Sequence, residues 1–196
     1  MVKADLVKKL REKTGVGMMT CKEALREADG DVEKAIEILR KKGQIKALKH
    51  AGRTTKEGLV ASYIHHGEKI GVLMEVSCET DFAAKSKDFK ELVRDLSMHI
   101  AASNPLYIKR EDVPNEVIAK EKEIIRAQVQ NKPPSAIEKI IEGKMEKFYK
   151  EVCLLEQPFV KSPDITVKEN IVSYIAKIGE NILVRRFTRY QVGEEI

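Results

Sequence analysis

A buried strand that runs directly into a helix constrains this chain more than any other feature of its sequence. From residue 70 to residue 78, apolar side chains take every second position, which is the period of a strand with one buried face. From residue 82 to residue 100 they recur instead at helical spacing. Thr80 suits an N-cap between the two elements, and the helix dipole favours Asp81 in the first turn. Phe82 therefore lies at a corner.

Two interpretations of Phe82 follow from this position. Its spacing to Phe89 and Leu92 makes it the first core residue of the helix, and an apolar residue on such a stripe is usually buried. A large ring beside a carboxylate at a corner can instead project into a partner protein. The spacing alone favours the buried interpretation.

Residues 4–43 predict a bundle of three short helices. Gly15 ends the first helix, and Thr20 begins the second as part of a capping box. Asp31 caps the third helix, and Gly43 ends it. We expect a domain over residues 1–43, a basic linker over 44–57 and a core over 58–196.

The core is predicted to be α+β, with a three-stranded antiparallel sheet. Residues 59–64 and 70–78 are the first two strands, joined by a turn, and residues 182–192 are the third.

Three helices are predicted between the second and third strands, after the one that follows the corner. Residues 116–131 and 135–152 are amphipathic, and Pro133 and Pro134 separate them, so that they form a helical hairpin over 116–152. A last helix covers residues 167–178.

Composition narrows the function classes. Hydrophobic residues make up 42% and charged residues 34% of the 196 residues, and the formal net charge is +5. The excess lies in residues 40–56, which hold seven Lys or Arg and no Asp or Glu. Such a run is usually a solvated helix face or linker, and otherwise steers the chain to an acidic partner or to RNA.

The sequence lacks the marks of an enzyme and of a membrane protein. It contains no Gly-rich phosphate loop, no metal-ligand spacing and no nucleophile beside a recognisable base, so we expect no catalytic residues, metal or cofactor. No apolar run approaches the ~20 residues that span a bilayer, and the first residues hold no signal core, so a cytoplasmic location is expected. Cys21, Cys78 and Cys153 form no close pair, as is typical of reduced, buried thiols.

Two motifs resemble the elongation factor Ts family. Residues Glu75 to Lys85 are similar to its central signature, and residues Leu10 to Leu25 to its N-terminal signature, in the expected order and at the expected distance. Shorter similarities continue through residues 98–102, 157–160 and 184–187. One departure is Ala83, where the family commonly has Val.

The resemblance implies a guanine-nucleotide exchange factor that binds the GDP-bound form of the GTPase elongation factor Tu. It implies that Thr80, Asp81, Phe82 and Ala83 enter the GTPase domain, with the ring acting near the Mg²⁺ site. It also implies that the N-terminal bundle is similar to a ubiquitin-associated domain. Through Arg11, Met18 and Met19, this bundle would contact another face of the GTPase domain. The core, with the region of His99, would reach a further domain of the partner.

Several alternatives stay open at this point. Met18 and Met19 either pack within the bundle or lie on its surface, because three short helices need every apolar group they have. A ribosome-associated RNA-binding module using residues 40–56 is the alternative function. It lacks an aromatic platform, since the chain holds five Phe, five Tyr and no Trp, and no direct contact with nucleic acid is expected.

Two copies of the chain are expected to act together. Longer members of the family resemble a duplicated core, whereas this chain holds one strand-helix signature. A three-stranded sheet also leaves edges that a homodimer would cover. Residues 167–178 and 182–192 are the predicted seam.

Overall fold

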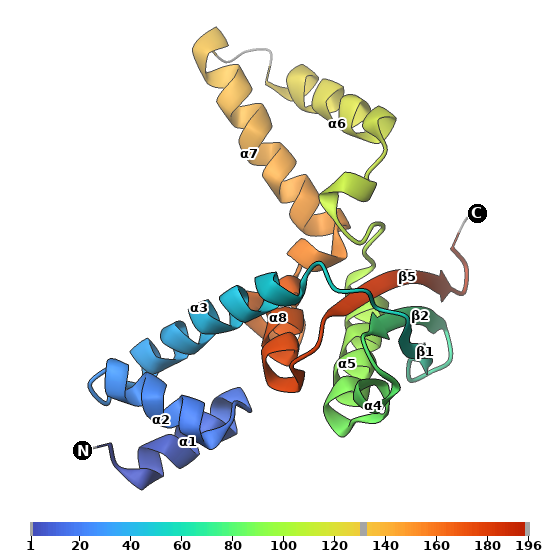
Figure 1. The fold of residues 1–196 in the computed structure, drawn as a ribbon. Coiled ribbons are helices and arrows are strands. Elements are labelled where there is room, and N and C mark those ends of the chain that lie inside the picture. The colour runs from blue at the N-terminus through green and yellow to red at the C-terminus, as the bar shows by residue number, and fades with distance from the viewer. Residues whose placement is uncertain (1, 130–132, 195–196) are drawn as a thin grey trace. The chain divides into compact units, whose positions relative to one another are not determined.

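The strand predicted over residues 70–78 is present as β2 (Ile70–Cys78), the middle strand of a three-stranded antiparallel sheet. The computed structural model describes residues 2–129 and 133–194 (Figure 1). β1 (Glu57–Ile64) and β5 (Ile182–Gln191) flank β2, in the order β1-β2-β5. Alternate side chains of β2 are buried, from Val72 to Cys78. The predicted sheet and the α+β fold class are therefore confirmed.

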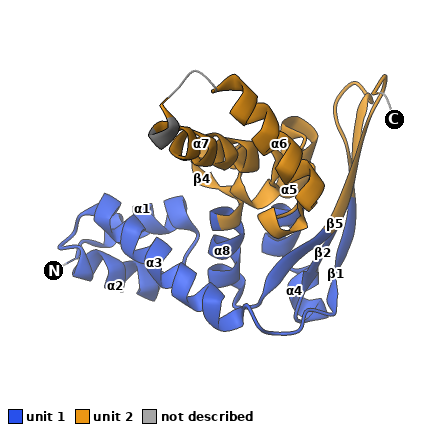
Figure 2. Cartoon of the chain, turned by 90° about the horizontal axis from the view of Figure 1, so that it is seen from above, with its two compact units in different colours: residues 1–61, 74–94, 169–185 blue, residues 62–73, 95–168, 186–196 orange. Residues whose placement is uncertain are grey.

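The chain forms two compact units, each assembled from separated segments (Figure 2). Unit 1 comprises residues 1–61, 74–94 and 169–185. Unit 2 comprises residues 62–73, 95–168 and 186–196. The predicted division into 1–43, 44–57 and 58–196 stays a prediction.

Unit 1 begins with a bundle of three helices, as predicted: α1 (Ala4–Thr14), α2 (Met18–Glu27) and α3 (Val32–His50). Gly15 ends α1 in the left-handed conformation (φ 66°) and donates its N–H to Arg11 O, and Asp31 caps α3 by accepting from Glu33 N and Lys34 N. The buried core of the bundle consists of Val7, Leu10, Cys21, Ala24, Leu25, Ala28, Ala35 and Leu39.

Two predicted helix boundaries in the bundle are wrong. α2 begins at Met18, with Cys21 N donating to Gly17 O, so Thr20 is inside the helix and forms no capping box. A cap contributes about 1 kcal/mol, which the buried side of this helix outweighs. α3 continues through Gly43 to His50, so the first residues of the predicted linker are helical.

Gly43 is a site of close helix packing rather than a helix stop. A Cβ on Gly43 would lie 3.6 Å from Ala176 Cβ, on α8 (Val167–Ile178), so the missing side chain lets α3 approach α8. One turn later, Lys46 Nζ donates to Ala176 O at 2.7 Å. Packing of this kind offsets the cost of about 1 kcal/mol for a glycine inside a helix.

Unit 2 contains the predicted helical hairpin, formed by α6 (Asn115–Gln128) and α7 (Pro134–Val152). Ile125, Ile141 and Met145 form its buried core. Two 3₁₀ helices flank the hairpin in sequence: η1 (Arg110–Asp112) precedes α6, and η2 (Leu154–Glu156) follows α7. Arg110 binds Glu146 with two hydrogen bonds of 2.6 Å and also pairs with Glu156, which ties the three elements together.

A second, two-stranded sheet in unit 2 was not predicted: β3 (Pro158–Phe159) pairs with β4 (Ser162–Thr166). His99 is fully buried next to it, on α5 (Lys87–Ser103). Its Nδ1 accepts from Val160 N at 3.2 Å, so Nε2 carries the proton and donates to Gln157 Oε1 at 2.9 Å. Burial lowers the pKa of His99, so the ring is a neutral structural group.

Gly58 in β1 is held against the backbone of β2. Its φ is +152°, and a Cβ would meet Val76 O at 2.1 Å. We expect Gly58→Ala to destabilise the protein by about 3 kcal/mol, because backbone atoms must move apart. Gly143→Ala is the matched control: nothing lies within 4 Å of its Cβ position in α7, so about 0.5–1 kcal/mol of stabilisation is expected. Urea unfolding measures both changes, and equal effects would contradict the packing argument.

The three cysteines are predicted to be unreactive in the folded protein. Cys21, Cys78 and Cys153 are buried free thiols, and burial is the main cause that raises the pKa of Cys78 and of Cys153 to about 11. At pH 8 only about one in a thousand of these two thiols is ionised. Ellman's reagent should therefore react slowly with the native protein and quickly with three thiols in guanidinium. Rapid reaction of Cys78 in the native state would contradict its burial.

Candidate functional site

At the corner after β2, a short helix, α4 (Asp81–Lys85), is followed at once by the beginning of a longer helix, α5. α4 follows β2 after two residues, and Thr80 caps it by accepting from Ala83 N at 3.3 Å. α4 ends at Ser86, whose backbone is extended. α5 begins at Lys87, where Phe89 N donates to Ser86 Oγ at 3.2 Å. The chain thus bends twice within a few residues.

Phe82 is not a core residue, so the interpretation favoured by its spacing is wrong. Its side chain is 83% exposed, the highest fraction among the exposed large hydrophobic residues of the described chain. The break at Ser86 is the physical reason, because it places Phe82 and Phe89 on different helices and interrupts the apolar stripe. Ala83 and Ala84 are the α4 residues that turn inward.

Asp81 is held in its ionised form beside the ring. Lys85, one turn along α4, donates to Asp81 Oδ2 at 2.7 Å. This hydrogen bond is the main cause that lowers the pKa of Asp81. The corner therefore presents an apolar ring next to a carboxylate that stays charged near neutral pH.

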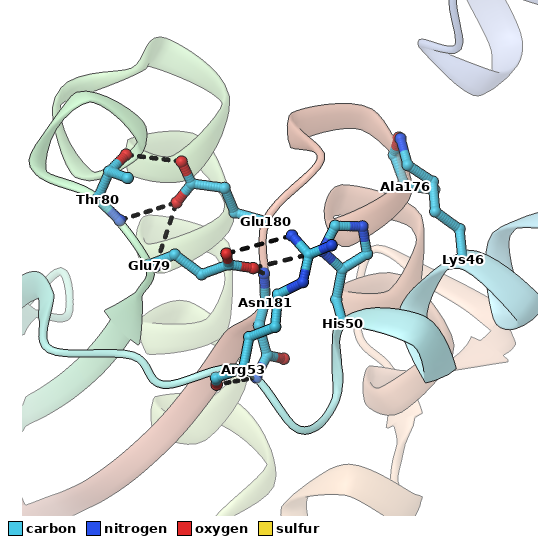
Figure 3. Close-up of polar contacts among 8 residues, drawn as sticks. All are labelled: Lys46, His50, Arg53, Glu79, Thr80, Ala176, Glu180 and Asn181. Atoms are coloured by element: carbon cyan, nitrogen blue, oxygen red, sulfur yellow. Dashed lines mark hydrogen bonds and ion pairs between the residues drawn. The ribbon is translucent and has the colours of Figure 1, made fainter.

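Two carboxylates that sequence reasoning missed hold the backbone of this corner (Figure 3). Glu180 accepts hydrogen bonds from Glu79 N, Thr80 N and the Thr80 hydroxyl. Glu79 accepts from Asn181 N and from the side chains of His50 and Arg53. No sequence signal pairs residues 79 and 180, which lie about a hundred positions apart.

The second predicted group, Arg11, Met18 and Met19, is exposed on the N-terminal bundle. Met18 and Met19 occupy the first turn of α2 and are 51% and 68% exposed, so neither packs in the core of the bundle. Arg11 is exposed in the last turn of α1. The structure thus brings Thr80 to Ala83 together in one turn and leaves this group on separate helices.

Several cationic side chains of the basic run 40–56 form ion pairs or hydrogen bonds with other residues of the same chain. Lys42 pairs with Glu27 at 2.6 Å, Lys46 binds the end of α8, and Arg53 binds Glu79. These contacts support the structural interpretation of the run over RNA contact.

Other kinds of site find little support. Across the part of the chain that the structure describes, no group of three or more His, Cys, Asp or Glu side chains could hold a metal ion. Within the same residues, no helix has the length and apolar character needed to cross a membrane.

Comparison with known proteins agrees with the motifs over most of the chain. Residues 4–173 match the family described as Elongation factor TS. Elongation factor Ts of Carboxydothermus hydrogenoformans is 61% identical over 196 residues, covering 99% of this chain and 90% of the relative. Elongation factor Ts of Moorella thermoacetica is 62% identical over 198 residues, covering 100% and 98%. That of Thermodesulfovibrio yellowstonii is 58% identical over 194 residues, covering 98% and 97%. The chain belongs to the elongation factor Ts family.

Proposed function

We propose that this chain is a guanine-nucleotide exchange factor that acts in translation elongation, in the cytoplasm, on the GDP-bound form of elongation factor Tu. The observation that carries the proposal is the exposure of Phe82 beside an ionised Asp81. Glu180 binds the backbone of the turn that carries both residues. Membership of the elongation factor Ts family supplies the partner. An aromatic ring left in water is a common anchor of a protein interface.

The proposed mechanism is displacement of the nucleotide, with no covalent step. A bound guanine nucleotide is held by backbone amides, a lysine and a Mg²⁺ ion that bridges its phosphates. The ring of Phe82 enters the GTPase domain near the Mg²⁺ site, with Thr80 and Asp81 lining the contact. Ala83, the fourth residue implied for this contact, is buried within the chain and supports the turn from inside. By linkage, the factor weakens nucleotide binding as much as the nucleotide weakens binding of the factor.

The N-terminal bundle is proposed to provide a second, anchoring contact. Arg11, Met18 and Met19 present a cation and two flexible thioethers on its surface, and methionine suits adaptable protein contacts. This contact adds affinity without touching the nucleotide site. We propose the bundle of residues 1–43 as a module of its own and residues 58–196 as the core that carries the corner.

Phe82→Ala tests the proposal directly. We expect GDP release from elongation factor Tu to slow about 30-fold, since an interface anchor contributes about 2 kcal/mol. The melting temperature should stay unchanged, because an exposed ring adds little to the core. Release of a fluorescent GDP analogue and thermal unfolding measure the two effects.

Leu106→Ala is the matched control, because this side chain is 61% exposed in unit 2, away from the corner in sequence. It should leave release unchanged. A folded Phe82→Ala variant with normal release would refute the ring's role. If the unmodified protein left GDP release unchanged and instead bound ribosomal RNA in a strongly salt-dependent way, the RNA-binding alternative would replace this proposal.

We also propose that the active species is a homodimer. β5 is an edge strand of the sheet, and Leu183, Tyr190 and Val192 on or next to it are exposed. On α8, Ile171 and Ile175 are already buried within the chain, which leaves β5 as the better part of the predicted seam.

Light scattering at micromolar concentration should give twice the chain mass of 22.2 kDa. The measurement is made under reducing conditions, so that no disulfide holds the pair. A monomer that exchanges nucleotide at the full rate would refute the dimer while leaving the exchange function intact.

A further inference from the structure

The backbone immediately before Asp81 and Phe82 is held by a single carboxylate from the other end of the chain. Glu180 Oε2 accepts from Glu79 N at 3.1 Å and from Thr80 N at 3.0 Å. Its other oxygen accepts from the Thr80 hydroxyl at 2.6 Å. Glu180 thus binds every donor of Thr80, the residue that also caps α4.

The contact is reciprocal, because Glu79 holds the segment that carries Glu180 (Figure 3). Glu79 Oε1 accepts from Asn181 N at 2.6 Å, and Asn181 Nδ2 donates to Arg53 O at 3.1 Å. Each carboxylate therefore accepts the backbone N–H of the segment opposite. The two chain segments, at the end of β2 and between α8 and β5, are locked in register.

The end of α3 supports this pair of carboxylates. His50 Nδ1 lies 3.3 Å from Glu79 Oε1, and Arg53 Nη1 donates to Glu79 Oε2 at 3.3 Å. The Glu79 side chain is only 18% exposed. Burial alone would raise the pKa of Glu79, but the hydrogen bonds from Asn181, His50 and Arg53 outweigh burial and lower it. Glu79 is therefore ionised and able to hold all three donors.

Contacts within α4 are too few to fix the direction of this short helix, so residues outside it must do so. α4 has five residues and buries only Ala83 and Ala84, so neither helix cooperativity nor a large apolar contact fixes its direction. Thr80 itself is exposed, and so is Phe82. The direction in which the ring projects is then set by the backbone at residues 79 and 80, where Glu180 binds.

We propose that Glu180, held in place by Glu79, is a positioning residue that aims Phe82 at the partner and so sets the maximal rate of nucleotide release. The inference rests on the proposed exchange function. It adds a residue about a hundred positions from the corner that touches neither the partner nor the nucleotide and acts only through the orientation of residues 80–82. Loss of this hold should lower the maximal release rate more than it weakens binding, since the N-terminal bundle still binds.

The decisive experiment compares Glu180→Ala, Phe82→Ala and the double variant in the full-length protein. With elongation factor Tu loaded with a fluorescent GDP analogue, Glu180→Ala should lower the maximal release rate about tenfold, as expected when a reacting group is misplaced. The concentration that gives half-maximal release should change much less. In the Phe82→Ala background, Glu180→Ala should cause no further loss, because its effect passes through the ring.

Two control variants separate position from charge and from general damage. Glu180→Gln keeps the side-chain length and an oxygen that accepts both N–H groups, so we expect release within about twofold of the unmodified protein. Glu142→Ala removes the same charge from an exposed position on α7 and should have no effect. Thermal unfolding identifies any variant that fails to fold.

The outcomes are distinguishable. Additive losses in the double variant, or a Glu180→Gln loss as large as that of Glu180→Ala, would overturn the positioning role. Normal release by a folded Glu180→Ala variant would overturn it too. If the unmodified protein does not accelerate GDP release, the proposed function itself fails. If it does, and Phe82→Ala alone loses activity, only the role of Glu180 is refuted.

Discussion

The segments of unit 1 are held together by backbone N–H groups that lie just outside the strands and are accepted by side chains instead of by a neighbouring strand. After Cys78 the chain departs from the sheet, and Glu79 and Thr80 present two N–H groups, while Asn181 presents a third before β5 begins. The N–H groups of Glu79 and Asn181 are partly buried, and a buried backbone donor without a partner costs about 1–3 kcal/mol. Two carboxylates accept all three donors. This arrangement joins segments 74–94 and 169–185 of unit 1. His50 and Arg53, which belong to segment 1–61, bind Glu79 and so join that segment to the other two.

Periodicity predicted the parts of this fold in which one side of an element faces the core throughout. The alternation along β2 and the apolar face of the hairpin gave the right elements, because the members of each set are buried or partly buried on one common side. Local caps at Gly15, Asp31 and Thr80 were also predictable, since the side chain or the left-handed backbone acts within four residues.

Prediction failed where a distant contact decided a local outcome. Gly43 has the sequence character of a helix stop, but α8 packs against it, and that contact is formed by residues far along the chain. Glu180 has no local mark of its role, because its partners are backbone atoms of residues 79 and 80. Phe82 is a different case. Ser86 is a recognisable N-cap three residues before Phe89, and this signal could have divided the apolar stripe into two helices.

The break at Ser86 separates the stability of the corner from its proposed function. Ala83 and Ala84 supply the inward contact of α4, and the largely exposed ring of Phe82 adds little to the apolar core. Small side chains, however, bury little area and give little directional hold. Direction must then come from hydrogen bonds, which depend on angle and distance far more steeply than apolar contact does. A corner that exposes its largest apolar group is for this reason held by the side-chain oxygens of Glu79 and Glu180, and the direction of the ring depends on these hydrogen bonds rather than on packing.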